Sequence, residues 1–315
     1  VTGVQTCALP ISRILLIGYN RPAETNRTAH ALAAALRITE AQHPAAIQPS
    51  IHAVIDGPKG DDGRRNDADL VDHVATTIRS IIPHVAVARH VRNRGLPSVI
   101  LEGLDDAFSN ESVDRVICVE DDAEIAPTAL SALLYSSERL DEPHVIAAAP
   151  LRDGIPPNQC LLVTRGAHRA SRLLLEEFIA RFDLDGRYGL RDHDAIRLWL
   201  ASLASARGIA APTATSQDAV RALAWQLEGI AVHALPMRLV AHRGLRGQHN
   251  TPLHAIRTGG AFEQLDRTQW EVLRPRLDAW IAGGGGTSEV HLGARERLLS
   301  SIARSAYGLL QRLRA

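Results

Sequence analysis

The sequence predicts an α/β protein in which helices flank a mostly parallel central sheet. Short apolar segments alternate with segments of helical periodicity through the first half of the chain, and this alternation is typical of parallel βαβ units. Polar residues follow the apolar segments, as expected where strands end in loops. With 315 residues, of which 45% are hydrophobic and 22% charged, the chain can also bury a substantial core.

Four strands are expected in the first half, each a short apolar run closed by turn-forming residues. The first run is followed by Tyr19 and Pro22, and the second by Asp56 and Gly57. Helices with one apolar face are expected between the strands. The expected strands are residues 12–18, 51–55, 84–89 and 114–119, and the expected helices are residues 25–36, 67–82 and 96–108.

The second half contains further segments of both kinds. Gly229 ends one helical segment and separates it from the strand that follows. The expected helices are residues 128–140, 171–182, 192–206, 215–227 and 270–281, and the expected strands are residues 145–149, 160–164, 230–235 and 238–240.

The two ends of the chain are set apart from this domain. Residues 1–11 resemble the translation of a sequencing-library adapter and are interpreted as an adapter-derived artefact outside the fold. One domain is expected over residues 12–282, followed by a linker of four glycines at residues 283–286. Residues 287–315 are interpreted as an amphipathic helix with five Arg and two Glu. This helix is expected either to contact an anionic membrane surface or a protein partner, or to pack on its own domain.

Charge and cysteine content exclude several classes of protein. The 35 basic and 35 acidic residues balance, and because nucleic-acid binding needs a basic face, no nucleic-acid partner is expected. No apolar run approaches the roughly 18 residues of a membrane span. Outside residues 1–11 the chain has two cysteines, Cys118 and Cys160, which are too few for a disulfide framework. Lys59 is the only lysine, and such a scarcity of lysine is typical of a GC-rich bacterial genome. We therefore expect a cytoplasmic bacterial protein, and the C-terminal helix leaves open a peripheral position at the inner face of the membrane.

Polar side chains follow the apolar runs of all four early strands. Because parallel strands end at the same edge of a sheet, where α/β proteins bind ligands, we expect these side chains to form a binding site. The same residue types are ordinary turn formers, so each loop alone is ambiguous. The side chains are Tyr19, Asn20 and Arg21 after the first strand, Asp56 and Lys59 after the second, Asn93 and Gly95 after the third, and Glu120, Asp121 and Asp122 after the fourth.

The fourth strand ends in three consecutive carboxylates, Glu120, Asp121 and Asp122. Adjacent like charges repel, and burying any of them unpaired costs free energy. A divalent cation offsets this cost, and Mg²⁺ or Mn²⁺ typically binds one or two carboxylates together with substrate phosphates. The stretch therefore indicates a metal site, with a solvated acidic turn as the alternative.

The order of these motifs resembles that of GT-A fold glycosyltransferases, in particular bacterial family-2-like enzymes that share features with N-acetylglucosaminyltransferase I. The resembling residues are 15–22, 54–59, 92–96 and 119–122. The resemblance implies a metal-dependent, inverting transfer of a sugar from a nucleoside-diphosphate sugar to an acceptor hydroxyl, in bacterial glycan or polysaccharide synthesis. The implied cofactor is Mn²⁺ or Mg²⁺, and the implied partners are the donor and a glycan or other hydroxyl acceptor.

The resemblance also implies roles for the residues at the strand ends. Asp122 would bind the metal directly, while Glu120 or Asp121 would face the ribose or the water molecules of the metal. Asp56 would read the base. The first position of the metal motif departs from the family pattern, because Glu120 stands where Asp is usual. The other residues implied to bind the nucleotide-sugar are Tyr19, Asn20, Arg21, Lys59, Asn93 and Gly95.

The catalytic base that the resemblance implies is a carboxylate at the start of a helix that precedes a strand. Asp218 fits this context, with Gln217 where the family has Glu. The base would take the proton of the attacking hydroxyl. A helix cap also explains Asp218, and Asp192 and Asp194 are the alternative bases.

A histidine near the end of the domain is implied as a further metal ligand. His249 fits the family pattern, in which Gly stands two positions before the histidine, and His242 is the alternative because it lies at a strand end. Each histidine is also explained as an ordinary surface residue.

Two other functions are kept open. A catalytically degenerate GT-A domain that serves as a scaffold or binding subunit is favoured by the change at Gln217. A sugar nucleotidyltransferase would share the nucleotide-binding half, but it needs a Gly-rich phosphate loop after the first strand, and residues 19–22 contain no glycine.

Overall fold

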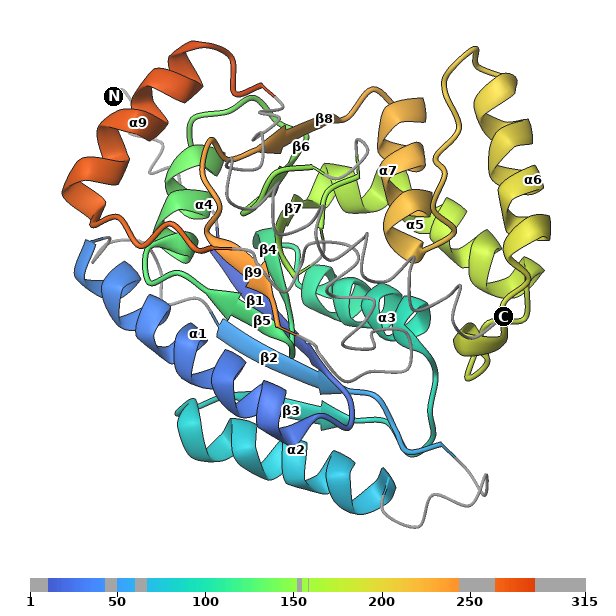
Figure 1. Cartoon of the computed structure of the whole chain (residues 1–315), viewed down its shortest axis with the longest axis horizontal. Coiled ribbons are helices and arrows are strands. Elements are labelled where there is room, and N and C mark those ends of the chain that lie inside the picture. The colour runs from blue at the N-terminus through green and yellow to red at the C-terminus, as the bar shows by residue number, and fades with distance from the viewer. Residues whose placement is uncertain are drawn as a thin grey trace, which may run out of the picture.

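The computed structural model describes residues 11–42, 50–59, 67–151, 155–157, 159–243 and 264–286. Helices and strands alternate through most of this part of the chain (Figure 1). The strands are β1 (Ile11–Gly18), β2 (Ser50–Ile55), β3 (Ala86–Arg89), β4 (Val113–Glu120), β5 (Ala123–Ile125), β6 (His144–Ala147), β7 (Cys160–Thr164), β8 (Ala231–Ala234) and β9 (Val240–His242). The helices are α1 (Pro22–Gln42), α2 (Asp67–Ile81), α3 (Leu96–Ser109), α4 (Ala129–Ser137), α5 (Arg165–Arg181), α6 (His193–Ser205), α7 (Gln217–Leu227) and α9 (Trp270–Ala282), with a 3₁₀ turn at Tyr188–Leu190.

A seven-stranded sheet forms the centre of the molecule, with the strand order β3-β2-β1-β4-β7-β6-β8. The pairs β1–β2, β2–β3, β1–β4 and β6–β8 are parallel, whereas β7 runs antiparallel to its neighbours β4 and β6. Near the carboxyl ends of β1 and β4, Ile17 pairs with Glu120. The loops that follow these two strands therefore begin side by side.

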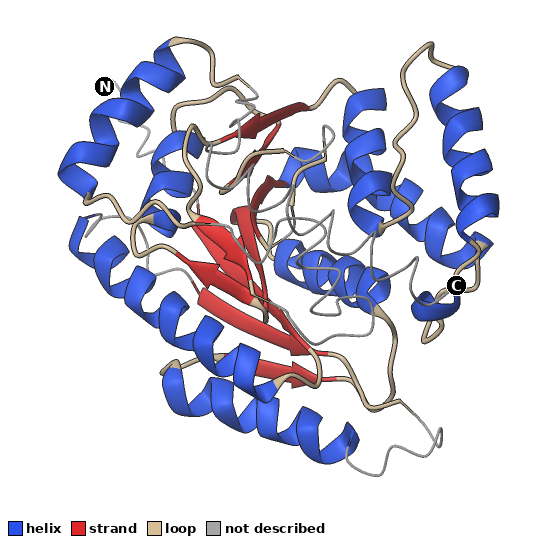
Figure 2. Cartoon of the chain, viewed as in Figure 1, coloured by secondary structure: helices blue, strands red, loops and turns tan. Residues whose placement is uncertain are grey.

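Helices cover both faces of this sheet (Figures 1 and 2). On one face α1, α2, α4 and α9 share a buried hydrophobic cluster with Ile14 and Leu16 of β1. On the other face α3, α5, α6 and α7 share a cluster with Leu15 and Ile17. Successive residues of a strand point to opposite faces, and burial on both faces explains why β1 is an uninterrupted apolar run. The structure confirms the predicted α/β class with a mostly parallel central sheet flanked by helices.

A separate two-stranded antiparallel sheet joins β5 to β9. Ala123 of β5 pairs with His242 of β9. The backbone N–H of Arg243 also donates to the carbonyl oxygen of Asp122 at 2.8 Å. This pairing places the end of β9 next to the carboxylates that follow β4. The sequence did not predict β5, because a three-residue strand is too short to show a period.

Two helices are longer than the sequence predicts. Helix α1 begins at Pro22, since proline is well suited to the first position of a helix, and it continues to Gln42. Helix α5 begins at Arg165, directly after β7, and Thr164 caps it by accepting a hydrogen bond from the backbone N–H of Ala167 at 3.4 Å. The polar residues of its first turns hid the helical period in the sequence.

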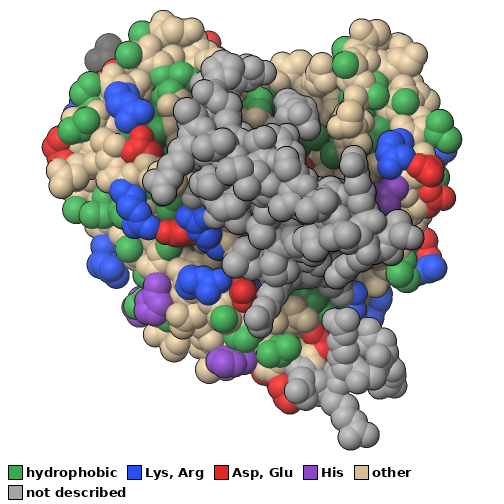
Figure 3. Space-filling model, viewed as in Figure 1, with side chains coloured by type: hydrophobic (Ala, Val, Ile, Leu, Met, Phe, Trp, Pro, Cys, Tyr) green, Lys and Arg blue, Asp and Glu red, His purple; other side chains and the backbone are tan. Residues whose placement is uncertain are grey.

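Acidic and basic side chains are interspersed over the described surface visible in Figure 3. This distribution agrees with the formal net charge of zero. None of the described helices combines the length and the apolar character that a bilayer-spanning helix needs.

The glycine segment at residues 283–286 follows α9 and turns back on the domain. The backbone N–H of Gly285 donates to the carbonyl oxygen of Trp280 at 3.0 Å, and Gly285 lies against the side chains of Leu140 and His233. The predicted C-terminal helix at residues 287–315 and residues 1–10 of the adapter-like segment lie outside the described residues.

Candidate active site

A cavity of about 550 Å³ lies at the carboxyl ends of β1, β2 and β4. Residues around the 3₁₀ turn and the start of α7 complete its lining. Its volume suits a small-molecule ligand, and its position is the one where α/β sheets bind ligands. The structure brings together twelve residues that the sequence singled out: Tyr19, Asn20, Arg21, Asp56, Lys59, Asn93, Gly95, Glu120, Asp121, Asp122, Asp218 and His242.

The remaining candidate residues are not in this lining. Asp192 caps α6, because its Oδ1 accepts hydrogen bonds from the backbone N–H groups of Asp194 and Ala195 at 3.0 Å each. Asp194 is exposed and forms an ion pair with Arg197. Neither carboxylate is among the described residues that line the cavity, and His249 lies outside the described part of the chain.

Asp56, at the end of β2, ties two loops together. Its Oδ1 accepts from the backbone N–H groups of Gly57 and Arg94 at 2.8 and 2.7 Å. Its Oδ2 accepts from the side chain of Asn93 at 2.8 Å and the backbone N–H of Gly95 at 3.0 Å. Burial raises the pKa of Asp56, and the backbone hydrogen bonds oppose this rise. The carboxylate thus shapes the loop after β3, and its role in reading a base stays a prediction.

Asp67, the first residue of α2, holds the rim of the cavity, and the sequence analysis did not single it out. It is 5% exposed and accepts from the Tyr19 hydroxyl at 2.7 Å, the Asn20 amide at 2.5 Å and the backbone N–H of Lys59 at 2.6 Å. An acidic residue in the first turn of a helix is common for reasons of the helix dipole alone. Its position in the sequence therefore gave no separate functional signal.

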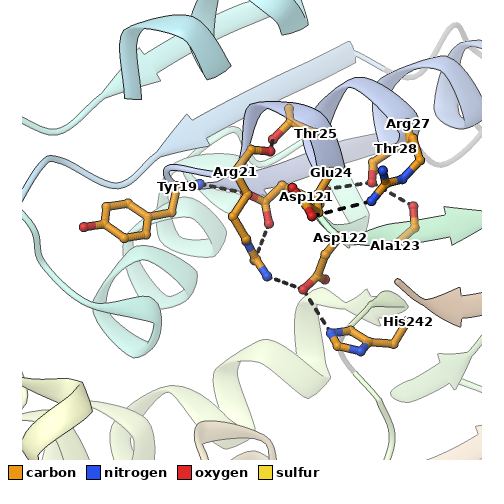
Figure 4. Close-up of polar contacts among 10 residues, drawn as sticks. All are labelled: Tyr19, Arg21, Glu24, Thr25, Arg27, Thr28, Asp121, Asp122, Ala123 and His242. Atoms are coloured by element: carbon orange, nitrogen blue, oxygen red, sulfur yellow. Dashed lines mark hydrogen bonds and ion pairs between the residues drawn. The ribbon is translucent and has the colours of Figure 1, made fainter. Parts of the chain in front are cut away.

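Arg21 lies between two adjacent buried carboxylates (Figure 4). Its guanidinium forms ion pairs with one oxygen each of Asp121 and Asp122, whose side chains are 2% and 3% exposed. The other oxygen of Asp121 accepts from the backbone N–H of Tyr19 at 2.9 Å. The sequence placed Arg21 in the loop over the nucleoside, whereas the structure shows that it also balances the charge of the acidic motif.

Asp122 has one oxygen bound by the protein and one that is not. Its Oδ2 contacts Arg21 and also lies 2.9 Å from Nε2 of His242 (Figure 4). Its Oδ1 is buried and has no hydrogen-bond partner among the described residues. Burial raises the pKa of Asp122, but Arg21 and the hydrogen bond from His242 outweigh it and lower the pKa to about 2. An ionised and unpartnered buried oxygen fits the ligand chemistry of a divalent cation.

The described side chains do not complete a coordination sphere on their own. Among them, no group of three or more His, Cys, Asp or Glu side chains is arranged to hold a metal ion. Mg²⁺ is commonly bound by one or two carboxylates, with water and substrate phosphates supplying the other ligands. The chemistry around Asp122 therefore suits a cation that arrives with a phosphorylated ligand.

Glu120 adds a third carboxylate to this group. Burial raises its pKa well above the ordinary value, and the negative charges of Asp122 and Asp218 raise it further. The three consecutive carboxyl groups after β4 are thus not all ionised at the same time, although the sequence alone would indicate three negative charges. A bound cation would favour the ionised form of Glu120.

Asp218 is the second residue of α7 and lines the cavity. Ser216 caps this helix, since its side chain accepts from the backbone N–H of Ala219 at 3.4 Å. Capping therefore does not account for Asp218. Burial raises its pKa to about 7, and the charge of Arg221 opposes the rise. A carboxyl group with a pKa near neutral is well matched to proton transfer.

Tyr188 and Gln217 form a contact that sequence reasoning missed. The Tyr188 hydroxyl donates to Oε1 of Gln217, and Nε2 of Gln217 donates to Oδ1 of Asp218 at 3.4 Å. A glutamate at this position would repel Asp218, whereas the amide supplies a hydrogen bond. Tyr188 lies in an irregular stretch, so no periodic signal marked it.

No protein-family model matches the chain, and no curated protein matches it either.

Solved structures give low-level similarities. The chain is similar to mannose-1-phosphate geranyltransferase from Thermus thermophilus, with 14% identity over 54% of this chain and 63% of that chain and a TM-score of 0.33. It is similar to mouse xyloside xylosyltransferase 1, with 14% identity over 72% of this chain and 85% of that one and a TM-score of 0.38. A cytidylyltransferase from Leptospira borgpetersenii serovar Hardjo-bovis shows 10% identity over 89% of this chain and 99% of the other, with a TM-score of 0.35.

The chain spans less than two thirds of the first of these proteins. All three are transferases by name, and nothing in them favours N-acetylglucosaminyltransferase I in particular. With TM-scores below 0.5, these similarities carry no conclusion about activity.

Proposed function

We propose that the chain is a GT-A type glycosyltransferase that moves a sugar from a nucleoside-diphosphate sugar to an acceptor hydroxyl, with inversion and with Mn²⁺ or Mg²⁺ as cofactor. The observation that carries the proposal is the buried, unpartnered Oδ1 of Asp122 in a cavity that also contains Asp218. In this proposal Asp122 would bind the metal that holds the diphosphate, and Asp218 would accept the proton of the acceptor hydroxyl. The proposed activity belongs to bacterial glycan or polysaccharide synthesis, the setting that the sequence resemblance implies.

The charge of the cavity supports a role for a cation. Five acidic and three basic side chains line it, and the raised pKa values of Glu120 and Asp218 reduce the formal excess of negative charge. A nucleoside diphosphate is itself an anion and would be repelled by the ionised carboxylate of Asp122. A divalent cation held by Asp122, with His242 beside it, offsets the repulsion and, when bound, stabilises the charge of the departing diphosphate.

Asp218 supplies the chemistry on the acceptor side. With a pKa of about 7, its carboxylate is partly ionised at neutral pH and accepts the proton of the attacking hydroxyl. The new glycosidic bond forms as the bond to the diphosphate breaks. The hydrogen bond from Gln217 at 3.4 Å orients the carboxylate.

In this proposal the loops after β1, β2 and β3 bind the nucleoside. Asp67 holds the first two loops and Asp56 holds the last two, so the lining side chains reach the ligand already positioned. Preorganised groups bind with a smaller entropy cost than mobile ones. The nucleotide-sugar residues are those that the sequence indicated: Tyr19, Asn20, Arg21, Asp56, Lys59, Asn93, Gly95, Glu120 and Asp121.

Thermal-shift measurements with UDP-sugars and GDP-sugars, with and without Mn²⁺, test the proposal. A ligand that binds only the folded state raises Tm, and the rise grows with the logarithm of the ligand concentration divided by its Kd. We expect at least one nucleotide-sugar to raise Tm only when metal is present. Asp122→Ala should abolish this metal-dependent rise because it removes the direct ligand. Asp194→Ala, which removes a carboxylate that is 84% exposed on α6, should keep it.

Turnover separates the proposal from its alternatives. A transferase releases the nucleoside diphosphate from the donor, whereas a scaffold binds the donor without releasing it. A nucleotidyltransferase instead forms a nucleotide-sugar and pyrophosphate from a nucleoside triphosphate and a sugar 1-phosphate. If neither UDP-sugars nor GDP-sugars show metal-dependent binding or turnover, the glycosyltransferase proposal is wrong.

A further inference from the structure

One guanidinium in the cavity, that of Arg191, has no anionic partner among the described residues. Arg191 belongs to the acceptor wall, which we define as Tyr188, Arg191, Gln217 and Asp218, all of which line the cavity. The Nε–H of Arg191 is buried and has no hydrogen-bond acceptor among the described residues, and no described carboxylate forms an ion pair with it. Arg21, in the same cavity, is by contrast paired with two carboxylates.

The Arg191 side chain is held in place by its neighbour. One terminal nitrogen donates to the carbonyl oxygen of Tyr188 at 3.1 Å, and Cζ lies 4.3 Å from the centroid of the Tyr188 ring. A guanidinium stacked on an aromatic ring keeps N–H groups along its edge, where a carboxylate or phosphate binds with two hydrogen bonds. Because the group is already ordered, an anion that binds it meets a reduced entropy cost.

Contacts along the acceptor wall connect Arg191 to the candidate base. Tyr188 donates to Gln217, and Gln217 donates to Asp218 at 3.4 Å. In the proposed reaction the donor sugar and the acceptor meet at Asp218, while the diphosphate lies with the metal at Asp122. Arg191 therefore belongs to the part of the cavity that holds the sugars.

We propose that Arg191 binds an anionic group, a carboxylate or a phosphate, on one of the two sugars that meet at Asp218. The proposal rests on the proposed function and adds the substrate class, which is an acidic sugar. A neutral sugar offers Arg191 only hydroxyl oxygens, which accept weaker hydrogen bonds from a guanidinium than a carboxylate or phosphate does and leave its charge unbalanced. The same site thus both binds the acidic sugar and disfavours its neutral analogue.

Binding measurements with paired sugars test this inference. In ligand-observed NMR titrations in the presence of UDP and Mg²⁺, glucuronate and glucose 6-phosphate should bind about tenfold or more tightly than glucose. UDP-glucuronate and UDP-glucose are compared in the same way, and this arm tells a donor anion from an acceptor anion. Arg191→Gln should abolish the preference for the acidic member, and Arg191→Lys should retain part of it. Arg207→Gln removes an exposed arginine at the end of α6 and should leave the preference unchanged.

The outcomes with Arg191→Gln locate the anion. If this variant loses the preference for acidic members only among free sugars, the anion belongs to the acceptor. If it loses the preference only among nucleotide-sugars, the anion belongs to the donor. Equal binding of acidic and neutral sugars by the wild type, or weakened binding of UDP itself by Arg191→Gln, overturns the inference. If UDP and GDP do not bind but Arg191 still selects glucuronate over glucose, the anion site stands and the transferase proposal fails. A Tm of Arg191→Lys close to the wild-type value shows that the fold is intact.

Discussion

Arg21 contacts one oxygen each of Asp121 and Asp122, whose side chains are 2% and 3% exposed. Ion pairs on a protein surface contribute little, but a buried charge that loses its partner is costly. Arg21 therefore balances the charge of these two carboxylates, and a divalent cation would compete with it for them.

Removing Arg21 should destabilise the protein and strengthen its response to metal. We expect Arg21→Gln to lower the free energy of unfolding by about 3 kcal/mol, because it leaves buried carboxylates without their cation. Mn²⁺ should then raise the Tm of the variant more than that of the wild type, since it meets carboxylates that no guanidinium occupies. Urea denaturation and thermal shift measure the two effects.

Arg27, on helix α1, which begins directly after Arg21, provides the matched control. Its side chain is 56% exposed and pairs with Glu24 at 3.6 Å, so Arg27→Gln should change the free energy of unfolding by less than about 1 kcal/mol. If Arg21→Gln is no less stable than Arg27→Gln and gains nothing extra from Mn²⁺, the carboxylates do not depend on Arg21.

At the scale of elements, the loops after β2 and β3 act as one unit because their backbones touch. A Cβ on Gly57 would lie 2.4 Å from the carbonyl carbon and oxygen of Arg92. The backbone N–H of Asn93 donates to the carbonyl oxygen of Pro58 at 3.0 Å, and Asp56 binds the same loop. This close approach requires a residue without a side chain.

Gly57→Ala should force these two loops apart. We expect a loss of about 1–3 kcal/mol in the free energy of unfolding, the range for overpacking, together with weaker nucleotide binding because Asn93 and Gly95 shift. Gly283→Ala is the control, since its nearest neighbour would be 3.4 Å away and its φ of −82° is open to any residue. Nucleotide titrations and denaturation on both variants check the prediction, and equal behaviour of the two would contradict it.

The early strands and the loops that follow them could be predicted from sequence because both follow from local rules. Leu15 and Leu16 are both 0% exposed on opposite faces of the sheet, and two-sided burial leaves a continuous apolar run. The edge that binds ligands then follows from the parallel strand direction. Ten of the residues that line the cavity lie in the loops and strand ends identified this way: Tyr19, Asn20, Arg21, Asp56, Lys59, Asn93, Gly95, Glu120, Asp121 and Asp122.

The places of Tyr188 and Arg191 in the acceptor wall and the ion pairs of Arg21 could not be predicted, because they depend on contacts between distant positions. Arg21 and its carboxylate partners are 100 and 101 positions apart. Tyr188 and Arg191 lie in an irregular stretch between α5 and α6, where no period indicates which side chains face inward. The pairing of β5 with β9, which places His242 beside Asp122, likewise leaves no trace in segments of three residues.

Over the whole molecule acidic and basic residues balance, yet folding collects more acid than base around the cavity. Burial raises the pKa of Glu120, Asp121 and Asp218. The folded protein therefore retains protons that the unfolded chain releases, so stability is lost as the pH rises toward neutral. Burying these carboxyl groups in the cavity, where they suit cation binding and proton transfer, thus lowers the stability of the folded protein near neutral pH.

Asp218→Asn should change how the stability of the protein depends on pH. The pKa of Asp218 rises from its ordinary value of 3.8 to about 7 on folding, so between about pH 4 and pH 7 the unfolded chain ionises first and wild-type stability falls. Asparagine does not titrate, so the Tm of the variant relative to the wild type should increase across this interval and stay constant above it. Thermal denaturation in buffers of matched ionic strength measures the difference, and a difference independent of pH would show that folding leaves this pKa unchanged.

Turnover should depend on pH in the opposite sense to stability, because the base acts only when ionised. Wild-type turnover should rise with pH through about 7, and Asp218→Asn should bind the metal and donor normally but turn over about 10² times more slowly. Asp194→Asn removes an exposed carboxylate from the start of another helix and should leave turnover unchanged. Unchanged turnover in the Asp218 variant would move the base to Asp192 or Asp194. Opposite pH trends in wild-type stability and turnover would be traced to the same buried carboxyl group if Asp218→Asn weakens the stability trend between about pH 4 and pH 7 and removes the rise in turnover.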